Sequence, residues 1–236
     1  MAAAKRTNMK SEDRRNQLLD CAYNLFFSQG FEATTVQDIM KMANVSKGGF
    51  YHHFTSKEEL MLAVFDRIAI QAASQMQVIV DDTSRTCTER LQAIYDLEAE
   101  SRKGMPIESL IYTSKIFLSD ANAGLHLVFN RTVARVSNPI LAQLIQEGQD
   151  RGEFVKRDAL AAAKFITFIN LSYNVDLAAA IDARGTERAD QAAEELKASI
   201  AIQFEAIDLV LGLPLGTIQF GSPDLADALM ASSPTN

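Results

Sequence analysis

Cysteine and histidine are scarce in this chain of 236 residues, which contains two cysteines and three histidines. Cys21 and Cys87 lie far apart, and neither has a cysteine or histidine at metal-ligand spacing nearby. We therefore expect two buried thiols in a reducing compartment, without a disulfide or a metal site. The sequence also lacks a nucleophile–base signature and a phosphate-binding loop. These absences argue against an enzyme and predict no cofactor.

Long apolar runs are missing as well. No uninterrupted apolar stretch approaches the roughly 20 residues that a membrane span needs. The basic residues near the amino terminus are followed by charged residues at 12–15, where a signal peptide would be apolar. We therefore expect a cytoplasmic protein without a membrane partner. Because 47% of the residues are hydrophobic and 22% are charged, the composition is typical of a soluble globular protein, and the length favours two domains.

Negative charge predominates, but it is distributed unevenly. The formal net charge is −7. Residues 1–60 contain eight Lys or Arg and seven Asp or Glu, whereas residues 61–236 contain fifteen and twenty-three. The first segment therefore carries +1 and the remainder −8. Because DNA phosphates repel an acidic domain, only the first sixty residues suit a contact with nucleic acid.

Apolar residues recur at helical spacing along most of the sequence, and strand-like alternation never extends beyond a few residues. The pattern predicts an all-α protein with a small amino-terminal three-helix domain and a larger helical domain. The helices expected in the larger domain cover residues 58–79, 86–103, 107–118, 122–136, 139–151, 158–182 and 187–211. Pro139 suits either a first helical turn or a kink within one continuous helix. We assign residues 1–10 to a disordered basic arm, 11–56 to the small domain, 57–212 to the larger domain and 213–236 to a loosely ordered tail.

A helix-turn-helix is predicted at residues 35–53. Thr35 and Asp38 have the spacing of a helix start in which side chains satisfy free backbone amides, and Ser46 can cap a second short helix after a tight turn. The inward-facing residues that fix the crossing of the two helices are Ile39, Ala43, Val45 and Phe50. In DNA-binding proteins the second helix of this motif fits the major groove.

The side chains left on the outer face of the second helix suit a phosphate-lined groove. Hydroxyls and amides bind phosphates, a lysine neutralises their charge, and glycines let the backbone approach closely. Lys57 adds a cation at the start of the next helix, beside amides that favour anions. The outward residues are Ser46, Lys47, Gly48, Gly49, Tyr51, His52 and His53. The alternative is that the aromatic residues only cap a small core and the glycines only form a turn, which fits single residues better than the whole array.

This stretch closely resembles the DNA-binding domain of TetR-family repressors. The resemblance covers residues 14–66 and rests on Gly30-Phe31, Thr34-Thr35, Ile39, Ala43, Val45 to Gly48, Phe50 to Phe54 and Ser56 to Leu60. It implies that the residues of the recognition helix that contact DNA are Ser46, Lys47, Gly48, Tyr51 and His52. It also implies that Thr35, His53 and Lys57 lie nearer the phosphate backbone.

Two positions depart from the family's usual pattern. Asn44 stands where the family usually has glycine at the turn, and asparagine tolerates a positive φ, so we expect the turn to persist. Gly49 offers no side chain at a position that could read a base. Sequence preference is then expected to rest on DNA shape or on Lys47, Tyr51, His52 and Gln37.

The resemblance also implies roles for the larger domain. In this family the last two helices of each subunit usually form a four-helix dimer interface, and the matching segments here are 158–182 and 187–211. A two-fold homodimer would space two recognition helices roughly 34 Å apart and demand a near-palindromic operator in double-stranded DNA. A pocket for a small-molecule effector is expected among the middle helices. Its candidate residues are Tyr95, Tyr112, Phe117, His126, Phe129, Asn170, Tyr173 and Asn174.

Each of these pocket candidates has a simpler alternative as core packing, and the asparagines have a further one at the dimer seam. The expected function is a repressor that a small-molecule effector releases from its operator. Such an effector must bind one conformer more tightly, since equal affinity for both shifts nothing. The helix that starts at Lys57 and enters the core at Phe65 and Ile68 is the expected lever. The alternative function is a constitutive regulator or an activator whose larger domain only dimerises or binds a protein partner.

Overall fold

The computed structural model describes residues 2–102, 114 and 123–219. Every regular element within these residues is an α-helix, which confirms the predicted all-α class. The helices are α1 (Ala2–Gln29), α2 (Val36–Met42), α3 (Lys47–Tyr51), α4 (Lys57–Val80), α5 (Cys87–Arg102), α7 (Ala123–Asp150), α8 (Ala159–Ala183) and α9 (Ala189–Leu211). The helix predicted over residues 107–118 lies outside the described residues, apart from residue 114. Among the described helices none is long and apolar enough to cross a membrane.

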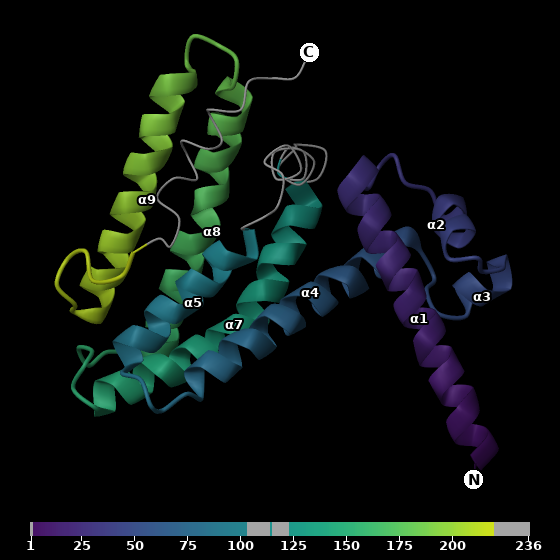
Figure 1. The fold of residues 1–236 in the computed structure, drawn as a ribbon, viewed down its shortest axis with the longest axis horizontal. Coiled ribbons are helices and arrows are strands. Elements are labelled where there is room, and N and C mark those ends of the chain that lie inside the picture. Colours follow the sequence, from purple (N-terminus) through teal and green to yellow (C-terminus); the bar gives the residue numbers. More distant parts are fainter. Residues whose placement is uncertain (1, 103–113, 115–122, 220–236) are drawn as a thin grey trace.

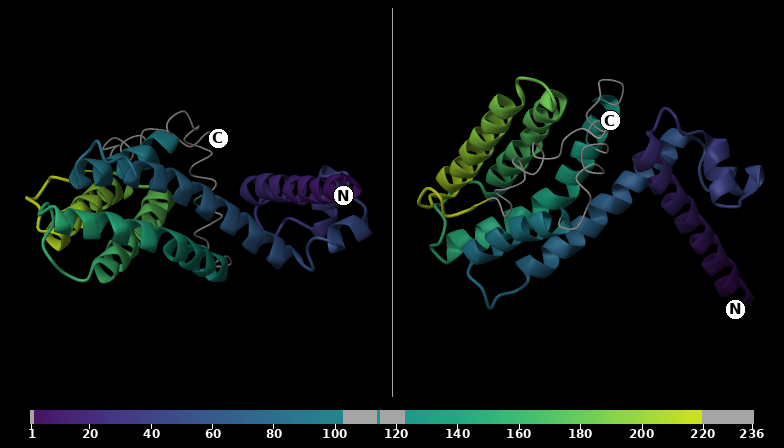
Figure 2. Two further views of the ribbon diagram at one scale, coloured as in Figure 1. Left: turned by 90° about the horizontal axis from the view of Figure 1, so that it is seen from below. Right: turned by 45° about the horizontal axis from the view of Figure 1, so that its top comes forward.

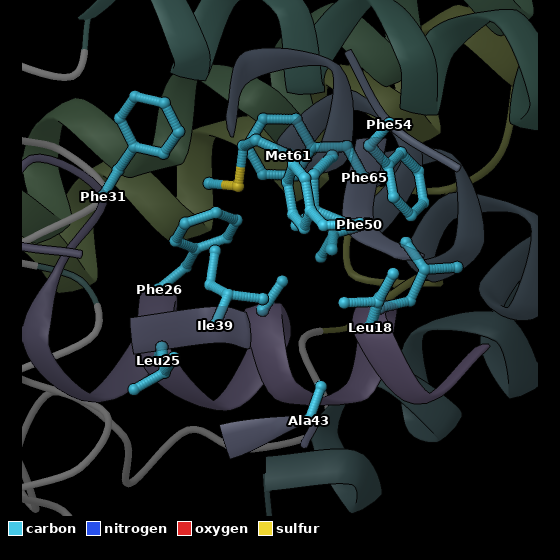
Figure 3. Close-up of a cluster of buried hydrophobic side chains, with 14 residues drawn as sticks. Leu18, Leu25, Phe26, Phe31, Ile39, Ala43, Phe50, Phe54, Met61 and Phe65 are labelled. Atoms are coloured by element: carbon cyan, nitrogen blue, oxygen red, sulfur yellow. The ribbon is translucent and has the colours of Figure 1, made fainter. Parts of the chain in front are cut away.

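The small domain is built from α1, α2, α3 and the beginning of α4. Each of these helices contributes buried apolar residues to one core. Examples are Phe26 of α1, Ile39 of α2, Phe50 of α3 and Leu60 of α4. Figure 3 shows Phe26, Ile39 and Phe50 in this cluster, together with Met61 and Phe65 of α4. Burial of several aromatic rings at about 25 cal/mol per Å² of apolar surface gives the short helices α2 and α3 a stability that they lack alone.

The first helix extends further back than expected. We predicted a disordered arm at residues 1–10, whereas α1 begins at Ala2. Residues 2–4 are alanines, the residue type with the highest helix propensity, and each added residue gains one backbone hydrogen bond once a helix exists. The amino-terminal half of α1 projects away from the rest of the small domain (Figure 1).

The long helix α4 connects the two domains. Its first turns belong to the small domain, and its last residue, Val80, is buried in the core of the larger domain. Figure 2 shows the helix running from one domain into the other in both views. Two adjacent residues near its middle form ion pairs with different helices. Asp66 pairs with Arg135 of α7 and Arg67 pairs with Asp20 of α1, each at 2.7 Å.

The larger domain packs α5, α7, α8 and α9 around a second apolar cluster. Leu144 of α7, Ile166 of α8 and Ile207 of α9 are all fully buried there. We predicted separate helices over 122–136 and 139–151, but α7 is continuous, so the alternative of one helix through Pro139 is the correct one. Pro139 is exposed, and water can therefore reach the carbonyl that the proline leaves without its helical partner.

The segment after α9 is held by side chains. Gly212 ends the helix in the left-handed conformation, with φ of 74°, as its position predicts. The buried Asp208 carboxylate then accepts hydrogen bonds from the backbone N–H groups of Thr217 at 3.0 Å and Ile218 at 3.1 Å. The predicted loosely ordered tail is therefore wrong for residues 213–219, because a carboxylate inside α9 anchors them. Residues 220–236 lie outside the described residues.

Candidate DNA-binding surface

The start of α2 is fixed by a reciprocal cap. The hydroxyl of Thr35 accepts a hydrogen bond from the Asp38 N–H at 3.1 Å, and the Asp38 carboxylate accepts from the Thr35 N–H at 3.0 Å. The Thr35 hydroxyl also donates to the Asp38 carboxylate at 2.6 Å, and this hydrogen bond, with the one from the Thr35 N–H, holds the pKa of Asp38 below its usual value. The helix start predicted from the Thr-x-x-Asp spacing is confirmed.

The turn between α2 and α3 depends on Asn44. This residue has φ of 49°, a left-handed conformation that asparagine adopts more readily than most residues, as we predicted for the position. The backbone N–H groups of Asn44 and Val45 donate to the carbonyls of Lys41 and Met40, at 3.2 and 2.9 Å. The turn therefore satisfies its own amides and sets the direction in which α3 leaves.

Helix α3 is short and is oriented by one buried residue. The Ser46 hydroxyl accepts from the Gly49 N–H at 3.2 Å and caps the helix, as predicted. Phe50 is fully buried, so the opposite face of the helix points to solvent. Tyr51 on that outer face is 49% exposed, although the edge of its ring meets Phe50. The helix ends at Tyr51, and the rings of His52 and His53, which follow it, have centroids 4.9 Å apart.

The ten residues predicted to contact DNA lie on α2, α3 and the start of α4 or directly beside the ends of these helices. Those exposed to solvent are Thr35, Gln37, Ser46, Lys47, Gly48, Tyr51 and His52. Those partly buried are Gly49, His53 and Lys57. Seven of them are thus exposed, and the remaining three are partly covered by the small domain.

Lys57 has a role within the domain. Its ammonium donates a hydrogen bond to the Phe31 carbonyl at 2.8 Å and lies 4.1 Å from the centroid of the Phe31 ring. The lysine therefore fixes the loop that follows α1 through a hydrogen bond and a cation–π contact. Two of its three N–H groups remain to bind a phosphate.

The two glycines of α3 differ in their surroundings, and this difference gives a prediction. A methyl group on Gly49 would lie 2.7 Å from a Val45 methyl, whereas one on Gly48 would meet nothing within 4 Å. We expect Gly49→Ala to destabilise the domain by about 1–3 kcal/mol relative to Gly48→Ala, which keeps the fold. Thermal unfolding of both variants measures this difference, and equal melting temperatures would contradict the packing role of Gly49.

Arg14 and Arg15 of α1 lie beside the end of α3, and we did not predict them from the sequence. The Arg15 guanidinium lies 5.1 Å from the centroid of the Phe54 ring. Partial burial lowers the pKa of His53, and the positive charges of His52, Arg15 and Arg14 lower it further. Arg15 is 39 positions from Phe54 in the sequence, so only the folded domain reveals this proximity.

The structure joins two of the predicted effector-pocket residues. Tyr95 of α5 is buried, and its hydroxyl accepts a hydrogen bond from the Asn170 amide of α8 at 3.2 Å. Burial raises the pKa of Tyr95 well above its ordinary value. The Tyr95 ring also meets the ring of Phe204 edge-on, with centroids 4.9 Å apart. These residues form a small polar pair inside an apolar cluster.

Two further pocket candidates within the described residues have neighbours on their own or other helices. Phe129 packs its ring against Phe65, with centroids 5.1 Å apart, and so contacts the core of the small domain. His126 is partly buried, and its Nε2 lies 3.3 Å from the amide nitrogen of Asn130. Tyr112 and Phe117 lie outside the described residues, as do the side chains of Tyr173 and Asn174.

Comparison with known proteins places the small domain in a family. Residues 18–64 match the model for "Bacterial regulatory proteins, tetR family". The chain is 29% identical over 149 residues to the HTH-type transcriptional repressor KstR2 of Mycolicibacterium smegmatis, covering 63% of this chain and 71% of that protein. It is 34% identical over 99 residues to KstR2 of Mycobacterium tuberculosis, covering 42% of this chain and 49% of that one.

Solved structures show that the likeness in fold extends beyond the small domain. The SmeT–triclosan complex aligns with a TM-score of 0.60 at 21% identity, covering 89% of this chain and 96% of that one. A putative TetR-family regulator from Mesorhizobium loti aligns with a TM-score of 0.59 at 21% identity, covering 85% and 97%. These structures show a common fold, while the tetR family match over residues 18–64 and the similarity to KstR2 indicate a DNA-binding transcriptional regulator. Its helix-turn-helix domain belongs to the tetR family, which confirms the resemblance seen in the sequence.

Proposed function

We propose that this protein is a repressor that binds a near-palindromic operator as a homodimer and leaves it when a small molecule binds. The observation that carries the proposal is the outer face of α3, where exposed polar residues stand on a helix fixed by the buried Phe50. Several similar proteins are named repressors, and SmeT is named in complex with triclosan. These names support the proposal and leave its details to experiment.

In this proposal α3 enters the major groove. Lys47 and Tyr51 reach phosphates or base edges, and the exposed Gly48 lets the backbone approach the DNA closely. Gln37 of α2 contacts base edges, and Thr35 binds a phosphate at the beginning of the same helix. Phosphate contacts position the helix, and contacts to base edges select the operator.

The partner surface is proposed on α8 and α9, which lie far from α3 in Figure 1. Phe168 of α8 is 70% exposed and Ile202 of α9 is 64% exposed. Phe165 of α8 and Leu209 of α9 are also exposed, and several large apolar residues exposed on the same two helices favour a surface that another protein covers. The apolar stripe of α9 that contains Leu196 and Ile207 is buried within the subunit, so the partner would meet the other side of the helix.

An effector is proposed to act through α4. The Tyr95–Asn170 pair offers hydrogen-bonding groups in apolar surroundings, which suits a mainly apolar small molecule with one polar group. Phe129 of α7 touches Phe65 of α4, so a shift of α7 would reach the core that supports α3. The effector must favour the shifted conformer, because only differential affinity changes the equilibrium.

Selection of bound duplexes from a random DNA pool tests this function. We expect an enriched inverted repeat whose half-sites are about one helical turn apart. Compounds that bind the protein are then added to the complex, and its dissociation is followed by fluorescence anisotropy. Absence of an enriched sequence would contradict DNA recognition. If every bound compound left operator affinity unchanged, the larger domain would belong to a constitutive regulator.

A further inference from the structure

Two arginines of α1 extend the candidate DNA-binding surface beyond the helix-turn-helix. The stem of Arg15 brings its guanidinium over the Phe54 ring, directly after α3 and next to His53. Arg14 precedes it, and both side chains are exposed. The positive charge of α1 therefore lies at the edge of the same surface that presents Tyr51 and His52.

Neither arginine is neutralised by a carboxylate within the described part of the chain. Arg14 donates a long hydrogen bond of 3.4 Å to the uncharged amide of Gln17. The charge of Arg15 contributes to the lowered pKa of Glu59. The Glu59 carboxylate, however, accepts hydrogen bonds from the Thr55 N–H at 2.7 Å and from the Thr55 hydroxyl at 2.5 Å. No ion pair of either arginine is found among the described residues.

Two further basic residues of α1 precede these arginines, separated from them in the sequence by the acidic Glu12 and Asp13. Arg6 and Lys10 precede Arg14 by eight and four residues in the sequence, and the backbone of α1 is helical from Ala2 onward. Positions separated by four residues lie on one face of a helix. A face with three basic positions in a row, in a chain of net charge −7, suits an anionic polymer better than a protein surface.

We propose that α1 is a second DNA contact, in which Arg14 and Arg15 bind phosphates that flank the major groove entered by α3. The partner is the phosphate backbone of double-stranded DNA, so the contact adds affinity and orientation without reading sequence. This inference rests on the proposed function, because it requires α3 to be bound in a groove. Arginine suits the role because its planar guanidinium can bind phosphate in a bidentate way and can also pack over an aromatic ring, as that of Arg15 does over Phe54.

The test measures the salt dependence of DNA binding for Arg14→Gln and Arg15→Gln in the full chain. Each lost phosphate contact is expected to reduce the slope of log affinity against log salt by about one and to weaken binding to selected and shuffled duplexes by similar factors. Arg157→Gln, which removes an exposed arginine between α7 and α8, is the control for charge alone. Arg15→Lys keeps the charge and is expected to retain the slope.

The outcomes separate this inference from the proposed function. If Arg14→Gln and Arg15→Gln bind with the wild-type slope while Tyr51→Ala loses affinity, α1 is not a DNA contact although α3 is. If Arg15→Gln lowers the melting temperature and leaves the slope unchanged, Arg15 only supports Phe54. If the wild-type chain binds no duplex, both proposals are overturned.

Discussion

Replacement of Phe168 with glutamate is expected to convert the protein into a monomer and to weaken operator binding by about 100-fold or more. Phe168 is 70% exposed on α8, and a partner subunit would bury it. A charge placed there would have to be buried without a counter-ion, which costs several kcal/mol. A dimer binds two half-sites at once, so a monomer loses the gain in effective concentration. Sedimentation and anisotropy on one operator duplex measure both effects.

Two variants make this test specific to the surface of α8 and α9. Ile202→Glu on α9 is expected to have the same effect, since Ile202 is 64% exposed. Val78→Glu on α4 is the matched control, because Val78 is 72% exposed but lies on neither proposed interface helix. If both Phe168→Glu and Ile202→Glu sedimented as dimers, the proposed interface would be wrong.

The second large effect concerns an ion pair between a buried arginine and a partly exposed glutamate where α4, α5 and α7 meet. Arg90 of α5 is fully buried, and its guanidinium donates to both carboxylate oxygens of Glu147 of α7, at 2.8 and 2.9 Å. It also donates to the Val80 carbonyl and the Cys87 sulfur. Glu147→Leu leaves the guanidinium charge buried without its partner, so we expect a loss of about 3–5 kcal/mol in the free energy of unfolding. Urea unfolding measures it.

A surface ion pair provides the control for this loss. Asp66→Ala removes the partner of Arg135, and because both side chains of that pair are more than half exposed we expect a change of less than about 1 kcal/mol. The double variant Arg90→Met/Glu147→Leu is expected to regain much of the loss, since no charge is left buried. Equal effects of Glu147→Leu and Asp66→Ala would contradict the account.

The same ion pair gives stability a dependence on pH. The hydrogen bonds and charge of Arg90 hold the pKa of Glu147 below the ordinary value of 4.5. The ion pair therefore makes its full contribution to the free energy of unfolding at pH values above 4.5. This contribution is lost as the pH falls through the lower pKa that Glu147 has in the folded state. Burial raises the pKa of the Cys87 thiol to about 11, so this cysteine stays protonated beside the arginine. The expected buried free thiol is confirmed for Cys87, whereas Cys21 is only partly buried.

Features set by neighbouring residues were predictable from the sequence. The caps at Thr35 and Ser46 involve residues three positions away, and the turn at Asn44 depends on one backbone conformation. The structure therefore repeats the predicted motif closely. The outward direction of Tyr51 also followed, because the buried position of Phe50 defines the opposite face of α3.

Features set by distant residues were not predictable in this way. The contact of Lys57 with Phe31 and that of Arg15 with Phe54 join residues 26 and 39 positions apart. Their side chains carry no local pattern, since any surface lysine or arginine looks the same in sequence. The anchoring of the chain after α9 by Asp208 was missed for a related reason: a lone carboxylate in a helix does not reveal which backbone amides will reach it.

The most direct measurement is the affinity of Tyr51→Ala and Lys47→Ala for a selected operator duplex, by fluorescence anisotropy across a range of salt concentrations. Both residues are exposed on α3, so the fold should persist. We expect each variant to lose about 1–3 kcal/mol of binding free energy, and the lysine variant to reduce the salt slope by about one. Tyr23→Ala, which removes a 38% exposed tyrosine from α1, should bind as the wild type does. Unchanged binding by both α3 variants would contradict α3 as the recognition helix.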